Sequence, residues 1–132
     1  RTDPLTLMGL VLADLGRYPE AEQWQKQALA LKEKVLGPEH PNIADSLLGL
    51  GQLRRRQGQN TEAMALLERA LQRAQESTRA EVQFELAQAL WSLDTRRARA
   101  RQLASEADAY WRKIGHPQSV RTEQWLATHG VP

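Results

Sequence analysis

Residues Gly37–Leu71 read GPEHPNIADSLLGLGQLRRRQGQNTEAMALLERAL and hold two helical segments separated by a turn at Gly58. Gly51 lies in the first segment, where a residue without a side chain allows a second helix to approach closely. Ala63, Ala70 and Leu71 share one face of the second segment, because their spacing matches the helical period. This stretch is therefore predicted to form one antiparallel helix pair.

The same unit occurs once before and once after this stretch. Upstream, five identical residues lie 42 positions earlier (51 − 9 = 42): Gly9, Gly16, Ala21, Ala28 and Leu29 match Gly51, Gly58, Ala63, Ala70 and Leu71. Downstream, the offset is 36 (87 − 51 = 36), with Ala87 in the place of Gly51 and Asp94 in the place of Gly58. Repeats of this length predict stacked helix pairs at about residues 3–36, 41–76 and 78–114, followed by one capping helix over 117–129.

Apolar residues at three- and four-residue steps mark the face that each helix should bury. Thr78 and Glu81 have the spacing of a capping box, which predicts that the third pair begins at a short entry over residues 77–79. The expected core comprises Leu5, Met8, Leu12, Leu15, Ala21, Trp24, Ala28, Leu31 and Val35 in the first pair, Ile43, Leu47, Leu50, Ala63, Leu66, Leu67, Ala70, Leu71 and Ala74 in the second, and Val82, Leu86, Leu90, Leu93, Ala100, Leu103, Ala104, Ala107, Trp111 and Ile114 in the third.

The composition fits one folded domain over residues 1–132, with 41% hydrophobic and 26% charged residues. The helical spacing, short turns and lack of an alternating strand pattern predict that this domain is all-α. The absence of cysteine rules out disulfides and cysteine-ligated zinc, and a net charge of +2 does not by itself indicate nucleic acid or membrane as a partner. The sequence has no apolar run of membrane-spanning length and no signal-peptide pattern, which favours a cytoplasmic protein. A start without methionine, partway into a repeat, indicates a fragment of a longer protein. The predominance of arginine over lysine favours a bacterial origin.

The repeated positions resemble the tetratricopeptide repeat. The resemblance rests on Leu50, Gly51, Gly58, Ala63, Ala70 and Leu71 and on their upstream counterparts. The 42-residue spacing and the connector over residues 36–41, LGPEHP, are similar to the kinesin light chain branch of that family. The resemblance covers about residues 3–114 and implies an α-solenoid of antiparallel helix pairs, wound as a right-handed superhelix with the first helix of each pair on the concave side. It also implies a protein-interaction module rather than an enzyme, with no cofactor.

Carrying the family's groove positions onto this chain gives a candidate peptide-binding surface. Light-chain repeats clamp a peptide backbone with asparagines, but Leu48 and Gly49 occupy the matching positions here, which disfavours that mode and kinesin cargo. Leu10, Phe84 and Trp91 with Leu48 instead predict an apolar strip with charged flanks, the alternative being that they pack as core. The candidate site residues are Thr6, Leu10, Asp14, Leu48, Gln52, Arg55, Arg56, Phe84, Gln88 and Trp91, with Asp3, Ala13, Asp45, Glu81 and Ser92 at further groove positions.

The favoured function is therefore the binding of a peptide segment of a partner protein, or of the parent chain, in a scaffold or signalling context. Two arginine-rich runs, residues 54–56 and 96–101, offer nucleic-acid or acidic-ligand binding as an alternative, although helix geometry spreads them around the axis and favours solvated faces. A structural spacer that self-associates as a homo-oligomer is a second alternative. The three histidines lack metal-ligand spacing, and no phosphate loop or nucleophile motif occurs.

Overall fold

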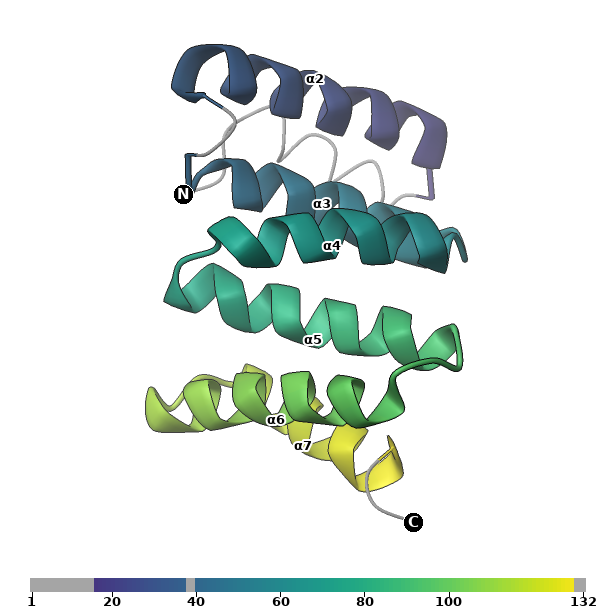
Figure 1. Cartoon of the computed structure of the whole chain (residues 1–132), viewed down its shortest axis with the longest axis vertical. Helices are drawn as coiled ribbons and strands as arrows, with labels where there is room; N and C mark the ends of the chain where they lie inside the picture. Colours follow the sequence, from purple (N-terminus) through teal and green to yellow (C-terminus); the bar gives the residue numbers. More distant parts are fainter. Residues whose placement is uncertain (1–15, 38–39, 130–132) are drawn as a thin grey trace.

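The computed structural model describes residues 16–37 and 40–129, and every regular element in this part of the chain is an α-helix. The helices lie one below the next along the long axis of the molecule, in their order along the chain (Figure 1). Each packs against its neighbours in sequence, so the prediction of an all-α array of sequential helix pairs is confirmed. The helices are α2 (Tyr18–Leu36), α3 (Ile43–Arg56), α4 (Asn60–Arg73), α5 (Glu76–Ser92), α6 (Arg97–Lys113) and α7 (Gln118–His129).

The turns inside the helix pairs have the backbone conformation that the repeat predicts. Gly58 separates α3 from α4 with a φ of 78°, in the left-handed region that glycine enters without steric cost. Asp94, 36 residues later, has a φ of 54°, and a short polar side chain makes this region accessible to aspartate. The prediction that Asp94 takes the place of the turn glycine is thus confirmed.

Gly51 lies where α3 and α4 are in close contact, as predicted. A Cβ atom built on Gly51 would lie 2.7 Å from both Cγ and Cδ2 of Leu67, a fully buried residue of α4. Carbon atoms do not approach this closely without overlap, so any side chain at this position would push the two helices apart or displace Leu67. The small residue therefore fixes how closely the pair packs.

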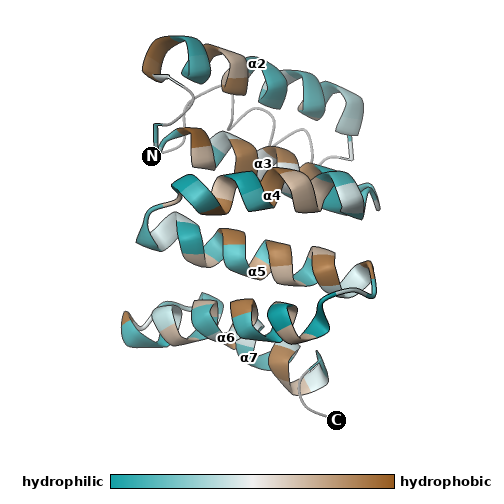
Figure 2. Ribbon diagram, in the orientation of Figure 1, coloured by the Kyte–Doolittle hydropathy of each residue, from teal (hydrophilic) through white to brown (hydrophobic). Residues whose placement is uncertain are grey.

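One hydrophobic cluster extends from α3 to α6 and contains most of the predicted core, including Trp111, which is 3% exposed. The prediction of burial is wrong for three residues: Leu31 is 52%, Val35 69% and Ile114 51% exposed. The buried residues of α2 are Ala21, Gln25 and Ala28, and Leu31 and Val35 follow them toward the C-terminal end of the helix, which is coloured as hydrophobic in Figure 2. Ile114 follows the last turn of α6 as its C-terminal cap. The predicted core positions before residue 16 lie outside the described residues.

The predicted capping box at Thr78 is wrong. Helix α5 begins at Glu76, with Gln75 as its N-terminal cap, so Thr78 already lies in the first turn. Its hydroxyl instead donates a 3.0 Å hydrogen bond to Oδ1 of Asp45 on α3. A contact between two repeat units has replaced the local cap that the spacing predicts.

Candidate functional site

Helices α3 and α5 lie in contact with each other and present polar side chains at equivalent positions. Asp45 and Glu81 are separated by 36 residues (81 − 45 = 36), and the same interval separates Gln52 from Gln88. All four residues are at least partly exposed. We call the surface formed by these four residues together with Arg55 the α3–α5 face. It contains five of the seven polar groove candidates of the second and third pairs. The other two, Arg56 and Ser92, are exposed and are not part of this face.

Glu85 holds the α3–α5 face together from its centre. One carboxylate oxygen accepts a 2.6 Å bond from Nε of Arg55, and the other accepts a 3.1 Å bond from Nε2 of Gln52. Glu85 is a buried residue, so these bonds replace the water that its charge loses on folding. Sequence reasoning missed Glu85. The available signal was a charged residue flanked by the apolar residues Phe84 and Leu86 on a helix face that the pattern predicts to be buried.

Two residues of the apolar strip predicted for a ligand, Leu48 and Phe84, are buried in the structure. Leu48 is 7% and Phe84 4% exposed, and both belong to the core cluster. The ring of Phe84 lies edge-on to Trp111 at a centroid distance of 6.2 Å, while Trp91 is half-buried. Packing between neighbouring helices therefore accounts for these side chains, which is the alternative that the sequence left open. The first-pair candidates Thr6, Leu10 and Asp14 lie outside the described residues.

Helix α7 extends the polar surface beyond α5, which sequence reasoning also missed. Gln124 follows Gln88 by a further 36 residues (124 − 88 = 36), so the interval itself was the signal. Between the two helices lies a shallow cavity of about 300 Å³. Its lining consists of Phe84, Gln88, Arg121, Gln124, Trp125 and Thr128.

The acidic end of the α3–α5 face contains a carboxyl group with a shifted pKa. Desolvation by the surrounding protein raises the pKa of Glu81, and the nearby carboxylates of Glu85 and Asp45 raise it further. His116 and Arg121 oppose the shift with their positive charge. The folded protein therefore disfavours the charged form of Glu81, so a cationic group of a ligand would find favourable electrostatics there.

We expect Glu81→Gln to increase stability at neutral pH. A raised folded-state pKa stabilises the protein below the unfolded pKa, and this contribution is lost as the pH rises through the folded value. The glutamine variant lacks this loss, so its melting temperature should exceed that of the wild type at pH 7 and approach it below pH 4, where both side chains are neutral. Thermal melts followed by circular dichroism across this range test the effect, and a constant difference at all pH values would contradict it.

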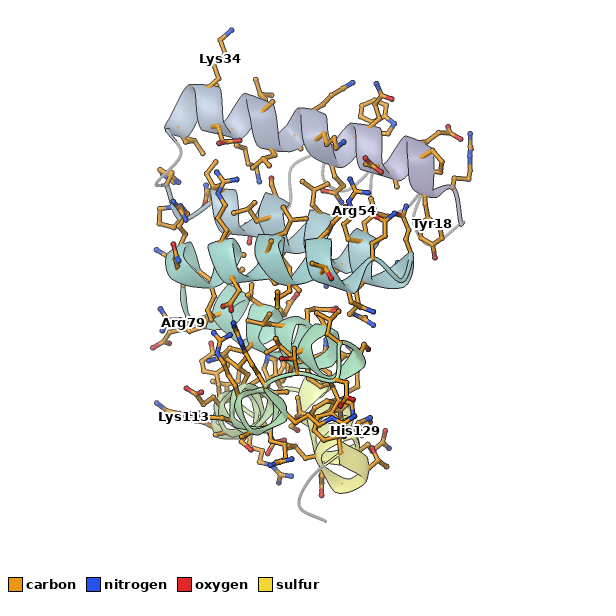
Figure 3. The ribbon with its side chains drawn as sticks, turned by 45° about the vertical axis from the view of Figure 1, so that its right-hand side comes forward. Tyr18, Lys34, Arg54, Arg79, Lys113 and His129 are labelled. Atoms are coloured by element: carbon orange, nitrogen blue, oxygen red, sulfur yellow. The ribbon has the colours of Figure 1, made fainter. Side chains whose placement is uncertain are left out.

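The arginine-rich runs are largely engaged in ion pairs between helices. Arg54 lies between α2 and α4 (Figure 3), where it contacts Glu22 at 2.8 Å and Glu62 at 3.3 Å. Arg99 on α6 binds both carboxylate oxygens of Glu68 on α4, and this hydrogen bonding, followed by the positive charge, lowers the pKa of Glu68. These contacts support the interpretation of the runs as helix faces that join neighbouring units.

The stacked helix pairs define a helical-repeat protein. The chain belongs to the tetratricopeptide repeat family, whose model matches residues 3–76, and domains of this family generally serve as protein-interaction modules and are typically non-catalytic. None of the described helices is long and apolar enough to cross a lipid bilayer.

Two similar solved structures are those of a Podosopora anserina protein designated a kinesin light chain, with nearly identical TPR-like repeats. The first superimposes with a TM-score of 0.81 and the second, a substituted variant of the same protein, with 0.80, each at 25% identity. The match covers 95% of this chain and 63% of each of those chains, so this chain spans less than two thirds of their length. No curated protein sequence matches this chain closely enough to be counted as a relative.

Proposed function

We propose that the α3–α5 face binds an extended peptide segment, either of a partner protein or of the parent chain, on the concave side of the array. In this role the array serves as a rigid scaffold within a cytoplasmic signalling protein. A preformed surface of this kind loses little conformational entropy on binding, because its helices are ordered before the ligand arrives. The family assignment supports a role in protein interaction. The residues of the α3–α5 face are the basis for proposing an extended peptide as the ligand.

The observation that carries this proposal is the pair Gln52 and Gln88 at equivalent positions of two neighbouring helices. A carboxamide has both donor and acceptor groups, as a peptide backbone does, so a row of glutamines can bind a main chain without selecting its side chains. Nε2 of Gln88 donates a hydrogen bond to the backbone carbonyl of Phe84 in the same helix. This bond orients the Gln88 side chain and leaves the side-chain oxygen of Gln88 as an acceptor for a ligand. Glu81 supplies a negative charge at one end of the face, whereas the charge of Arg55 is paired with Glu85, and this asymmetry would set the direction of the bound segment.

The test ligand is a peptide selected from a displayed random library for binding to the wild-type chain. Titration calorimetry then measures the affinity of this peptide for the wild type, for Gln88→Ala and for Gln102→Ala, the last of which changes an exposed residue of α6 outside the face. Because a central contact at an interface contributes about 1–3 kcal/mol, Gln88→Ala should weaken binding about tenfold or more. The Gln102→Ala variant should bind as the wild type does. Equal affinity of all three chains would place the ligand elsewhere and contradict the proposal.

A further inference from the structure

Helix α7 covers one side of α5 with a row of large side chains. The ring of Trp125 lies edge-on to Phe84 at 6.1 Å and to Trp91 at 5.6 Å between centroids. One turn later, His129 stacks on Trp125 at 4.4 Å, and one turn earlier Arg121 lies 5.3 Å above the Phe84 ring. Arg121, Trp125 and His129 follow one another at intervals of four residues, so they form one stripe along α7. We call Phe84 and Trp91 together the aromatic face of α5.

The remainder of α7 is only lightly held. Thr122 is its one buried residue, and the hydroxyl of Thr122 donates a 2.7 Å hydrogen bond to Oδ1 of Asp108 on α6. Trp125 and Leu126 are half-buried, and Val120 is 55% exposed. The ion pair between Arg112 and Glu123 is exposed, and pairs of this kind contribute little. An element with so little buried apolar surface opens at a small fraction of the global free energy of unfolding.

The surface along the seam between α5 and α7 is hollowed. The cavity of about 300 Å³ lies along this seam and is lined from both helices. Helix α7 packs mainly on α6 and reaches α5 through its long side chains (Figure 3, which labels His129). Helix α5, by contrast, is anchored by residues buried on several sides. The aromatic face is therefore a fixed part of the core with a loosely attached cover.

We propose that the aromatic face of α5 is a docking surface for a helix of a partner protein, and that α7 is its intramolecular occupant, displaced when the partner binds. The stripe on α7 specifies the chemistry of that partner: an amphipathic helix with a cationic residue followed four positions later by a large aromatic residue. The aromatic side chain takes the place of Trp125, and the cation takes that of Arg121 over the Phe84 ring. The aromatic face adjoins the α3–α5 face at Gln88, which lines the cavity beside Phe84. The two proposals are tested with different ligands, the α7 peptide here and a selected peptide with Gln88→Ala there, so the failure of one is distinguishable from the failure of the other.

A labelled synthetic peptide with the sequence of residues 117–129 serves as the probe, added to the full chain and followed by fluorescence anisotropy. In the Trp125→Ala chain the internal competitor is weakened, so the peptide should bind about tenfold or more tightly than it does to the wild type. The Val120→Ala chain changes an exposed residue of the same helix and should match the wild type. A peptide carrying Trp125→Ala should not bind, and Phe84→Leu in the Trp125→Ala chain should abolish binding while leaving the helical circular dichroism spectrum intact.

Hydrogen exchange of the unmodified wild-type chain gives a second, independent readout. The amides of α7 should exchange at least tenfold faster than those of α5, because α7 opens without global unfolding. Exchange of α7 and α5 at one common rate would overturn the proposal, as would peptide binding that is insensitive to Phe84→Leu. The proposal would also be overturned if light scattering showed that the wild-type chain is a dimer and the Trp125→Ala monomer did not bind the peptide. The aromatic face would then accept the α7 helix of a second copy.

Discussion

The Trp111→Ala variant is expected to lose about 3–5 kcal/mol of unfolding free energy, the usual cost of truncating a fully buried tryptophan. Trp111 lies in α6 with only 3% of its surface exposed and belongs to the central cluster. Its ring packs edge-on against Phe84, so its removal would leave a cavity next to the aromatic face of α5. The surrounding helices are close-packed and cannot fully collapse into this space.

Trp24→Ala is the matched control for this variant. Trp24 lies on α2, the second helix of the first pair, and is half-buried, packing against the small cluster of Ala21 and Leu53. We expect it to lose less than about 2 kcal/mol, as partly exposed side chains usually do. Urea denaturation of both variants, followed by circular dichroism at 222 nm, gives the two free energies. Equal losses would show that the two tryptophans contribute alike and would contradict this account.

These two tryptophans also show where sequence reasoning reaches its limit. Both lie at core positions of the helical pattern, which leads to the same expectation for each. A periodic pattern shows which face of a helix is apolar, but not which neighbour covers that face. Trp111 packs between α5 and the following turn, whereas Trp24 lies on the same flank of α2 as the exposed Leu31 and Val35.

The arrangement of helices was predictable because its determinants are local. Gly51 and Gly58, with their counterparts 42 residues upstream and 36 residues downstream, indicate a close contact and a turn without reference to the remainder of the chain. The entry to α5 was not predictable in this way. Thr78 has the spacing of a local cap, but its hydroxyl binds Asp45, which lies 33 residues away in the sequence. A long-range partner is invisible to a rule based on spacing.

The candidate site, too, was predictable from the sequence only where its determinants are local. Gln52 and Gln88 occupy equivalent positions of successive repeats, as the interval of 36 residues predicts, and Arg55 follows Gln52 by about one helical turn on α3. The burial of Phe84 was not predictable, because it depends on the path of the last helix after the turn at Gly115 and on contact with Trp125. The aromatic residues expected to bind a ligand are thus covered by the chain itself, which motivates the displacement experiment above.

Leu67→Ala is expected to lose about 2–5 kcal/mol, and the effect of a second substitution, Gly51→Ala, should change sign in its presence. Leu67 is fully buried, and its Cγ and Cδ2 atoms occupy the space that a Cβ on Gly51 would need. In the wild type, Gly51→Ala should therefore cost stability, because overpacking of about 1–3 kcal/mol exceeds the gain of about 1 kcal/mol in helix propensity. In the Leu67→Ala chain the space is vacant, so the same methyl group should fill part of the cavity and increase stability.

Urea denaturation of the four chains in this cycle measures the coupling directly. Leu86→Ala, at an equally buried leucine of α5, replaces Leu67→Ala in the control cycle. There the effect of Gly51→Ala should remain destabilising and additive to within about 0.5 kcal/mol. If Gly51→Ala were stabilising in the wild type, helix propensity would outweigh the contact with Leu67. The spacing of α3 and α4 would then not depend on the glycine, and the interval between glycines would mark the repeat without determining how its helices pack.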